Sequence, residues 1–140
     1  MTTETGFSSE EKAAMKQASF ERKRKGKTTP AEDLAECMAA FDKMNADDQA
    51  IALKLHEILI SEGPALAPKT WYGMPAYQLN GKVICFFQNA GKFKTRYHTL
   101  GFTEHAALDA GKFWPNAYAL LSITPEVEQE IRLLVRRAVS

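Results

Sequence analysis

The spacing of hydrophobic residues predicts helices at both ends of the chain and strands between them. In residues 30–63 and 125–138, apolar side chains recur every three or four positions, as on one face of a helix. Thr29-Pro30 and Thr124-Pro125 each place a capping residue before a proline, which is a common helix start. We therefore expect helices over these segments, with a break in the first at Asn45 and an end near Gly63-Pro64.

The central segment, residues 69–101, predicts three strands joined by tight turns. Asn80-Gly81 supplies the residue types that a two-residue hairpin turn requires, and Asn89-Ala90-Gly91 predicts a second tight connection. From Phe93 to Thr99, side chains alternate between two sets, as in a half-buried strand. A short helix is expected near 103–111, followed by a last strand at Tyr118–Ile123.

These elements predict an α+β fold, with a mainly antiparallel four-stranded sheet packed on one side by helices. We expect this domain to span residues 29–140 and residues 1–28 to form an N-terminal helical extension. The extension starts with the capping box Ser8–Glu11 and ends in a basic run at 22–27. That run fits either contact with an acidic partner or nucleic acid, or a solvated helix end whose cations suit the helix dipole.

The predicted register divides the sheet into a core face and a second face. It places Tyr77 opposite Ile84 and Phe86 opposite Lys94. The core face is expected to hold Met74, Val83, Cys85, Phe87, Phe93 and Tyr97. The second face is expected to hold the candidate binding residues: Trp71, Tyr77, Phe86, Lys94, Arg96 and His98.

A sheet face that mixes aromatic and cationic side chains predicts one of two roles. Such a face can stack on a planar ligand or on nucleic-acid bases, or it can dock an acidic protein partner. The alternative is that helices or loops cover the aromatic rings, while the cations only keep the sheet soluble.

Charge and motifs narrow the classes of function. The chain has 18 basic and 17 acidic residues, and this net charge of +1 argues against a dedicated nucleic-acid binder. No GxSxG, HExxH, GxGxxG or GxxxxGK[ST] pattern is present, which favours a non-enzymatic protein with no catalytic residue, no metal ligand and no resident cofactor. Cys37 and Cys85 are isolated among apolar neighbours and are expected to be reduced core thiols.

Acidic residues gather on the polar side of the two helices predicted in 30–63. This ridge could hold hard cations weakly through carboxylate oxygens, or it is an ordinary solvated face with acids at helix starts. Its members are Glu32, Asp33, Glu36, Asp42, Asp47, Asp48, Glu57 and Glu62.

The start of the chain and its hydropathy bear on location. The first residues are polar and acidic, which predicts no signal peptide, and no apolar run is long enough to cross a bilayer. We expect a cytoplasmic protein without membrane contact, a monomer or weak homodimer, whose partner is an acidic protein or a small anionic ligand.

The segment Lys69–Tyr77, KTWYGMPAY, followed by Gly81-Lys82-Val83 and Phe86-Phe87, resembles the YdhG-like family of small bacterial proteins. The likeness covers about residues 29–140. Some members are described as frataxin-like iron chaperones with a helix-flanked antiparallel sheet. The resemblance therefore implies a frataxin-like fold and iron handling, and it makes the acidic helices and the sheet face candidates for iron and partner docking.

Overall fold

The helices begin where their capping residues predict. The Thr29 hydroxyl accepts a hydrogen bond from the Glu32 backbone N–H at 3.1 Å, and the Glu32 carboxylate accepts one from the Thr29 N–H at 2.7 Å. Asn45 and Thr124 cap two later helices through their side chains. These capping bonds satisfy N–H groups that a helix start would otherwise leave unpaired.

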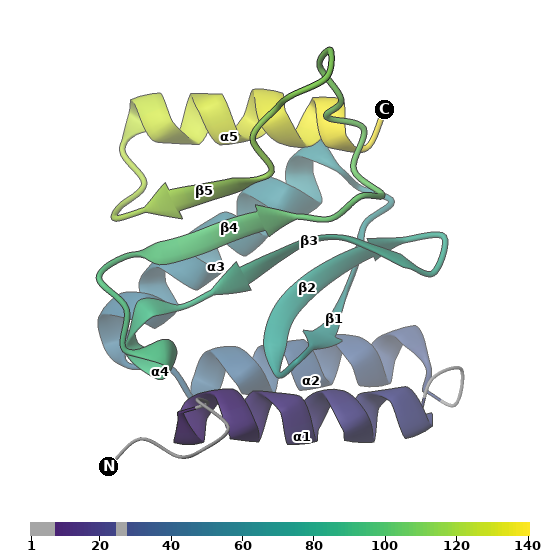
Figure 1. Cartoon of the computed structure of the whole chain (residues 1–140), viewed down its shortest axis with the longest axis vertical. Helices are drawn as coiled ribbons and strands as arrows, with labels where there is room; N and C mark the ends of the chain where they lie inside the picture. The colour runs from purple at the N-terminus through teal and green to yellow at the C-terminus, as the bar shows by residue number, and fades with distance from the viewer. Residues whose placement is uncertain (1–7, 25–27) are drawn as a thin grey trace.

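The computed structural model describes residues 8–24 and 28–140, with the backbone alone at 22–24, so the predicted basic run lies outside the described side chains. Figure 1 shows the arrangement of its elements. The helices are α1 (Ser9–Arg24), α2 (Pro30–Asp42), α3 (Ala46–Glu62), α4 (Ala90–Phe93) and α5 (Pro125–Ala138). The strands are β1 (Ala67–Trp71), β2 (Met74–Leu79), β3 (Lys82–Gln88), β4 (His98–Phe102) and β5 (Ala117–Leu120).

The strands form one antiparallel sheet in which spatial order follows chain order, β1-β2-β3-β4-β5. The α+β class and the antiparallel sheet are confirmed, whereas the predicted count of four strands is wrong. The extra strand arises because the chain reverses at Tyr72-Gly73, where both residues have positive φ (54° and 76°). This turn pairs Trp71 with Met74.

The alternating segment Phe93–Thr99 does not form the predicted strand. Residues 90–93 form the short helix α4, which ends at Lys94 in the left-handed conformation (φ 57°), and β4 starts only at His98. Phe86 therefore pairs with Gly101 instead of Lys94. Residues 103–111 form turns in place of the predicted short helix.

The Asn80-Gly81 hairpin turn is confirmed, and its strands pair Leu79 with Lys82. Beyond this turn the register shifts, so that Tyr77 faces Cys85 and not Ile84 as predicted. The inserted residue is typical of a β-bulge, which moves the following side chains to the opposite face.

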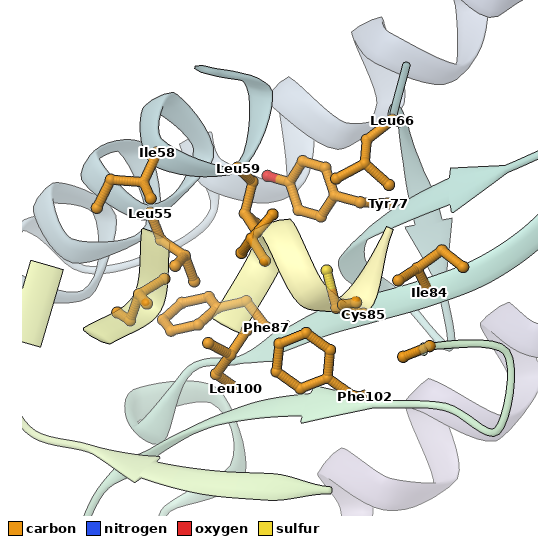
Figure 2. Close-up of a cluster of buried hydrophobic side chains, with 14 of the residues drawn as sticks. Leu55, Ile58, Leu59, Leu66, Tyr77, Ile84, Cys85, Phe87, Leu100 and Phe102 are labelled. Atoms are coloured by element: carbon orange, nitrogen blue, oxygen red, sulfur yellow. The ribbon is translucent and has the colours of Figure 1, made fainter. Parts of the chain in front are cut away.

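Helices α2, α3 and α5 cover one face of the sheet and enclose the core (Figure 2). Cys85 and Phe87 belong to this core, as predicted, and Tyr77 joins them at 1% exposure. Tyr97, predicted to point inward, is exposed.

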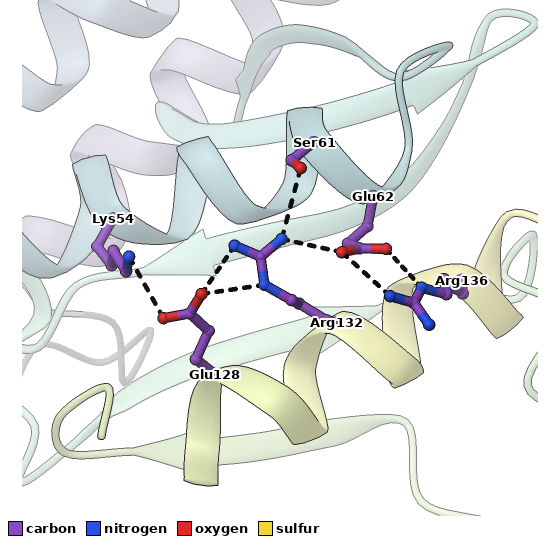
Figure 3. Close-up of polar contacts among 6 residues, drawn as sticks. All are labelled: Lys54, Ser61, Glu62, Glu128, Arg132 and Arg136. Atoms are coloured by element: carbon purple, nitrogen blue, oxygen red, sulfur yellow. Dashed lines mark hydrogen bonds and ion pairs between the residues drawn. The ribbon is translucent and has the colours of Figure 1, made fainter. Parts of the chain in front are cut away.

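An ionic network ties α5 to α3 beside this core (Figure 3). Arg132 bridges Glu128 at 2.7 Å and Glu62 at 2.9 Å, Arg136 also contacts Glu62, and Lys54 contacts Glu128 at 3.3 Å. Hydrogen bonds from both arginines hold the pKa of Glu62 below its ordinary value. The acidic ridge is therefore partly used in fixing α5 to α3.

Helix α1 is in contact with the rest of the fold, although its residues were expected to be an extension. Ala14 and Ala18 are buried, and the Glu21 carboxylate accepts the Tyr72 N–H at 2.9 Å and the Gly73 N–H at 3.4 Å. This helix borders the sheet face that α2, α3 and α5 leave uncovered.

Candidate functional site

The structure brings together two of the six predicted binding residues, Trp71 and Phe86. They lie on the sheet face opposite the core, with ring centroids 5.2 Å apart. Ala76, on the strand between them, pairs with Phe86 and is fully buried. A small side chain at this position lets two large rings meet across β2.

Tyr77 and His98 lie on the core face, which corrects their predicted placement. Tyr77 changes face because of the bulge in β3, and its hydroxyl lies 2.8 Å from Nδ1 of His56. His98 is 6% exposed because β4 begins there, in register with buried Leu120. Neither side chain shares a surface with Trp71 and Phe86.

Lys94 and Arg96 lie in the irregular segment between α4 and β4. Lys94 therefore does not make the pairing with Phe86 that the sequence predicts. The Lys94 ammonium contacts the Glu10 carboxylate of α1 at 3.0 Å, and the Arg96 guanidinium lies 5.1 Å from the centre of the Tyr97 ring. Their predicted roles in binding remain predictions, but they do not form one surface with the two aromatic rings.

The two rings belong to an aromatic cluster that also includes Tyr72. Its ring meets Trp71 edge-on at a centroid distance of 4.8 Å. The Phe86 ring lies directly on Gly101, where a Cβ atom would come within 2.2 Å of the ring. The Phe86 ring can therefore contact the backbone of residue 101 only because that residue is glycine. An aromatic ring over a glycine on the neighbouring strand is a known way to stabilise a sheet.

The aromatic cluster lines a cavity of about 760 Å³ on the second face, which we call the aromatic cavity. Cations and acids both contribute to its rim. The lining residues include Lys69, Trp71, Tyr72, Lys82, Phe86, Gly101, Glu21, Glu104 and His105. Lining by aromatic rings with a few polar groups is typical of small-molecule sites.

The charges at the aromatic cavity are unequally engaged. Glu21 is held by the two N–H groups of the Tyr72-Gly73 turn. Lys69 and Lys82 form no ion pair with any residue in 8–24 or 28–140. Two ammonium groups are therefore free to meet an anion at this rim.

A second cavity, of about 690 Å³, lies between α1, α2 and α4. Lys92 lines it, half-buried, and donates a hydrogen bond from Nζ to the Gly73 carbonyl at 3.3 Å. Burial, followed by the nearby charge of Lys43, lowers the pKa of Lys92. Glu36 lines the same cavity, so its charge is mixed.

A buried polar cluster closes the α4 end of this cavity. The Asp48 carboxylate, 7% exposed, accepts hydrogen bonds from Asn89 Nδ2 at 2.9 Å and from the Gly91 N–H at 2.8 Å, both at Oδ2. His98 accepts the Ala90 N–H at Nδ1, and its Nε2 lies 3.9 Å from Asp48 Oδ1. All of these partners are internal, so the cluster anchors α4 to α3 and β4.

Sequence reasoning missed Tyr72, Lys69, Lys82 and Gly101 as parts of the aromatic cavity. The missing information was the turn at Tyr72-Gly73 and the pairing of β3 with 98–102. The segment Lys69–Tyr77, which carries the family resemblance, does lie at the aromatic cavity, since it supplies the Trp71 and Tyr72 rings.

Within the described part of the chain, no three histidine, cysteine, aspartate or glutamate side chains are grouped closely enough to hold a metal ion. Iron handling stays a prediction from the resemblance. None of the helices in 8–24 and 28–140 is both long and apolar enough to cross a membrane. No protein-family model, curated protein or solved structure matches this chain.

Proposed function

We propose that this protein is a non-enzymatic, cytoplasmic binding protein whose aromatic cavity holds a flat organic anion. The ligand stacks on the rings of Trp71 and Phe86, and its acidic group lies at the rim beside Lys69 and Lys82. The observation that carries the proposal is the contact between these two rings, with Phe86 over Gly101, in a cavity large enough for a small molecule.

Both rings are half-buried, so part of each ring is open to the cavity. Stacking of a planar molecule on an aromatic side chain is worth about 1–3 kcal/mol for each ring. Because the floor at Gly101 has no side chain, Phe86 lies flat against the sheet, and its ring is already held in place before a ligand arrives.

The rim favours an anion over a neutral ligand. Lys69 and Lys82 have no carboxylate partner among the described residues. Of the two acids at the rim, Glu21 is occupied by backbone N–H groups, and Glu104 alone does not balance the two ammonium groups. A carboxylate or phosphate on the ligand would gain charge-assisted hydrogen bonds there.

Tryptophan fluorescence tests the proposal directly. The Trp114→Phe variant leaves Trp71 as the single tryptophan. A panel of flat anions (adenosine monophosphate, flavin mononucleotide and benzoate) and neutral adenosine would be titrated at two salt concentrations. We expect a saturable change in Trp71 emission with at least one anion, weaker binding of adenosine, and weaker anion binding at high salt.

Two matched variants separate stacking from charge. Phe86→Leu should abolish the response, while Phe113→Leu, which changes a 94% exposed phenylalanine elsewhere, should leave it intact. Lys82→Gln should weaken the anion about tenfold, equivalent to about 1.4 kcal/mol, without weakening adenosine. The proposal is refuted if no anion of the panel gives a saturable signal, or if both phenylalanine variants respond alike.

A single-stranded oligonucleotide belongs in the same titration, because the aromatic rings could also stack on nucleic-acid bases. With a net charge of +1, we expect the oligonucleotide to bind no more tightly than the mononucleotide. Binding that strengthens steeply with strand length would favour a nucleic-acid module in place of a small-ligand site.

A further inference from the structure

Helix α5 carries one stripe of side chains along the edge of the core, on the side that faces the groove next to β5. Leu133 and Leu134 lie three and four residues after Glu130, and four and three residues before Arg137, so the four side chains lie on one side of the helix. Leu133 is 48% exposed, Leu134 is half-buried, and the charged residues at both ends are exposed. The stripe therefore has an apolar centre, an acid at one end and a base at the other.

The neighbouring side of α5 is different, because its charges are already paired. Glu128, Arg132 and Arg136 make ion pairs with Lys54 and Glu62 of α3 (Figure 3). Glu130 and Arg137, in contrast, form no ion pair with any described residue. They are seven residues apart, about 10 Å along the helix, so they cannot pair with each other within one chain.

The stripe continues onto an open edge of the sheet. Strand β5 lies beside α5 and pairs with β4, and no other strand in residues 8–24 or 28–140 pairs with its outer edge (Figure 1). A groove of about 420 Å³ runs between β5 and α5, lined by Tyr118, Ala119, Leu133 and Arg137 among others.

Edge strands of monomeric proteins are usually protected by charged residues or proline. Residues 117–120, Ala-Tyr-Ala-Leu, contain neither, and the next residue, Leu121, is 68% exposed. The edge and the helix stripe thus present one continuous surface that lacks the usual protection against pairing.

We propose that two copies of this chain associate through this surface, about a twofold axis that runs α5 of one copy antiparallel to α5 of the other. The stripe is symmetric in spacing: Glu130 precedes Leu133 by three residues, and Arg137 follows Leu134 by three. An antiparallel helix pair centred between the leucines places Glu130 of each copy against Arg137 of the other, so each ion pair occurs twice.

This charge complementarity selects a second copy as the occupant. A twofold interface is formed by the same patch on both subunits, so the patch must complement itself. An acid and a base at equal distances from an apolar centre meet that requirement. In the same twofold arrangement, the outer edge of β5 can pair antiparallel with the β5 edge of the second copy.

Sedimentation equilibrium of the full chain over a wide concentration range tests the proposal. We expect a monomer–dimer equilibrium. The single charge reversals Glu130→Arg and Arg137→Glu should each weaken dimerisation roughly tenfold or more, because two attractive pairs become two repulsive ones. The double variant E130R/R137E should recover the original association, since the pairs form again with exchanged signs.

Leu133→Arg should abolish the dimer, while Leu53→Arg should leave it unchanged. Leu53, on α3, is 44% exposed and so matches Leu133 as a surface leucine. Circular dichroism of each variant establishes that it is folded. A chain that stays monomeric at millimolar concentration overturns the proposal, as does a dimer that is insensitive to Leu133→Arg or a charge-exchanged double variant that remains as weak as the single variants.

Discussion

Replacement of Asp48 by alanine should destabilise the protein far more than the same change at Asp47. Both residues lie in the first turn of α3, where a negative charge suits the helix dipole. Asp47 is exposed, whereas Asp48 is buried and accepts two hydrogen bonds, from Asn89 and from the Gly91 N–H. Asp47→Ala thus measures the loss of the dipole interaction alone.

The size of the difference follows from these contacts. A hydrogen bond to a charged group contributes about 1.5–3 kcal/mol, and Asp48→Ala removes two while leaving the Asn89 amide donor buried. We expect a loss of about 3–5 kcal/mol for Asp48→Ala and of at most about 1 kcal/mol for Asp47→Ala. A loss of that size is a large part of the 5–15 kcal/mol by which a typical domain is stable.

The Asp48→Asn variant separates hydrogen bonding from charge. Both bonds end on Oδ2, so the amide oxygen of asparagine can accept both, while its NH₂ group takes the position that faces His98. We expect a loss between those of the two alanine variants.

Equilibrium urea unfolding, followed by far-ultraviolet circular dichroism, measures all three variants. Equal midpoints for Asp47→Ala and Asp48→Ala would show that the buried carboxylate contributes no more than its helix position, and this reasoning would then be wrong.

Three further outcomes are expected. Gly101→Ala should displace the Phe86 ring, lower the free energy of unfolding by about 1–3 kcal/mol and alter tryptophan emission. Unchanged stability and emission would contradict the placement of the Phe86 ring over Gly101. Burial lowers the pKa of His56, so the folded state binds a proton there less readily than the unfolded state does, and stability should fall as pH drops below the ordinary value of 6.5. In urea titrations at several pH values, His56→Gln should make this fall in stability shallower. An equal dependence of stability on pH in both proteins would contradict the prediction. Burial raises the pKa of Cys37 and Cys85 to about 12, so a thiol reagent should label them only as the protein unfolds, and rapid labelling of the native protein would argue against their burial.

The elements with strong local signals could be predicted from sequence. Caps at Thr29, Asn45 and Thr124 fix the starts of three helices because the capping bonds are made within four residues. The Asn80-Gly81 turn is equally local, since both residues take positive φ readily. These signals sufficed for the α+β class.

The errors occurred where local signals were ambiguous. Tyr72 adopts positive φ although it is a bulky residue, so nothing in its type announces the β1–β2 turn. The alternation in Phe93–Thr99 is typical of a strand, yet a left-handed Lys94 ends a single helical turn there. The pairing of β1 with β2 decides the first case, and the pairing of β3 with residues 99–102 decides the second.

The residues of the candidate site also divide into those that local sequence signals could place and those that they could not. Trp71 and Phe86 were predicted on one face, as the structure has them, but the prediction treated Trp71 and Tyr77 as one strand, and the turn at Tyr72-Gly73 separates them. Gly101 could not be placed, because its role depends on which residue of β3 lies opposite, and Tyr77 was misplaced by the inserted residue in β3. Registers of this kind are tertiary information.

Each strand of the sheet pairs with the strand that precedes it in the chain, so the sheet can grow during synthesis. As each strand leaves the ribosome, its partner strand is already present, and the longest connection that must close is the one between Phe102 and Ala117. Until α5 emerges after the five strands and covers Leu100 and Leu120, the nascent sheet exposes part of its apolar face. The arrival of this fourteen-residue helix thus ends the period in which the newly made sheet is most vulnerable to aggregation and to cellular proteases.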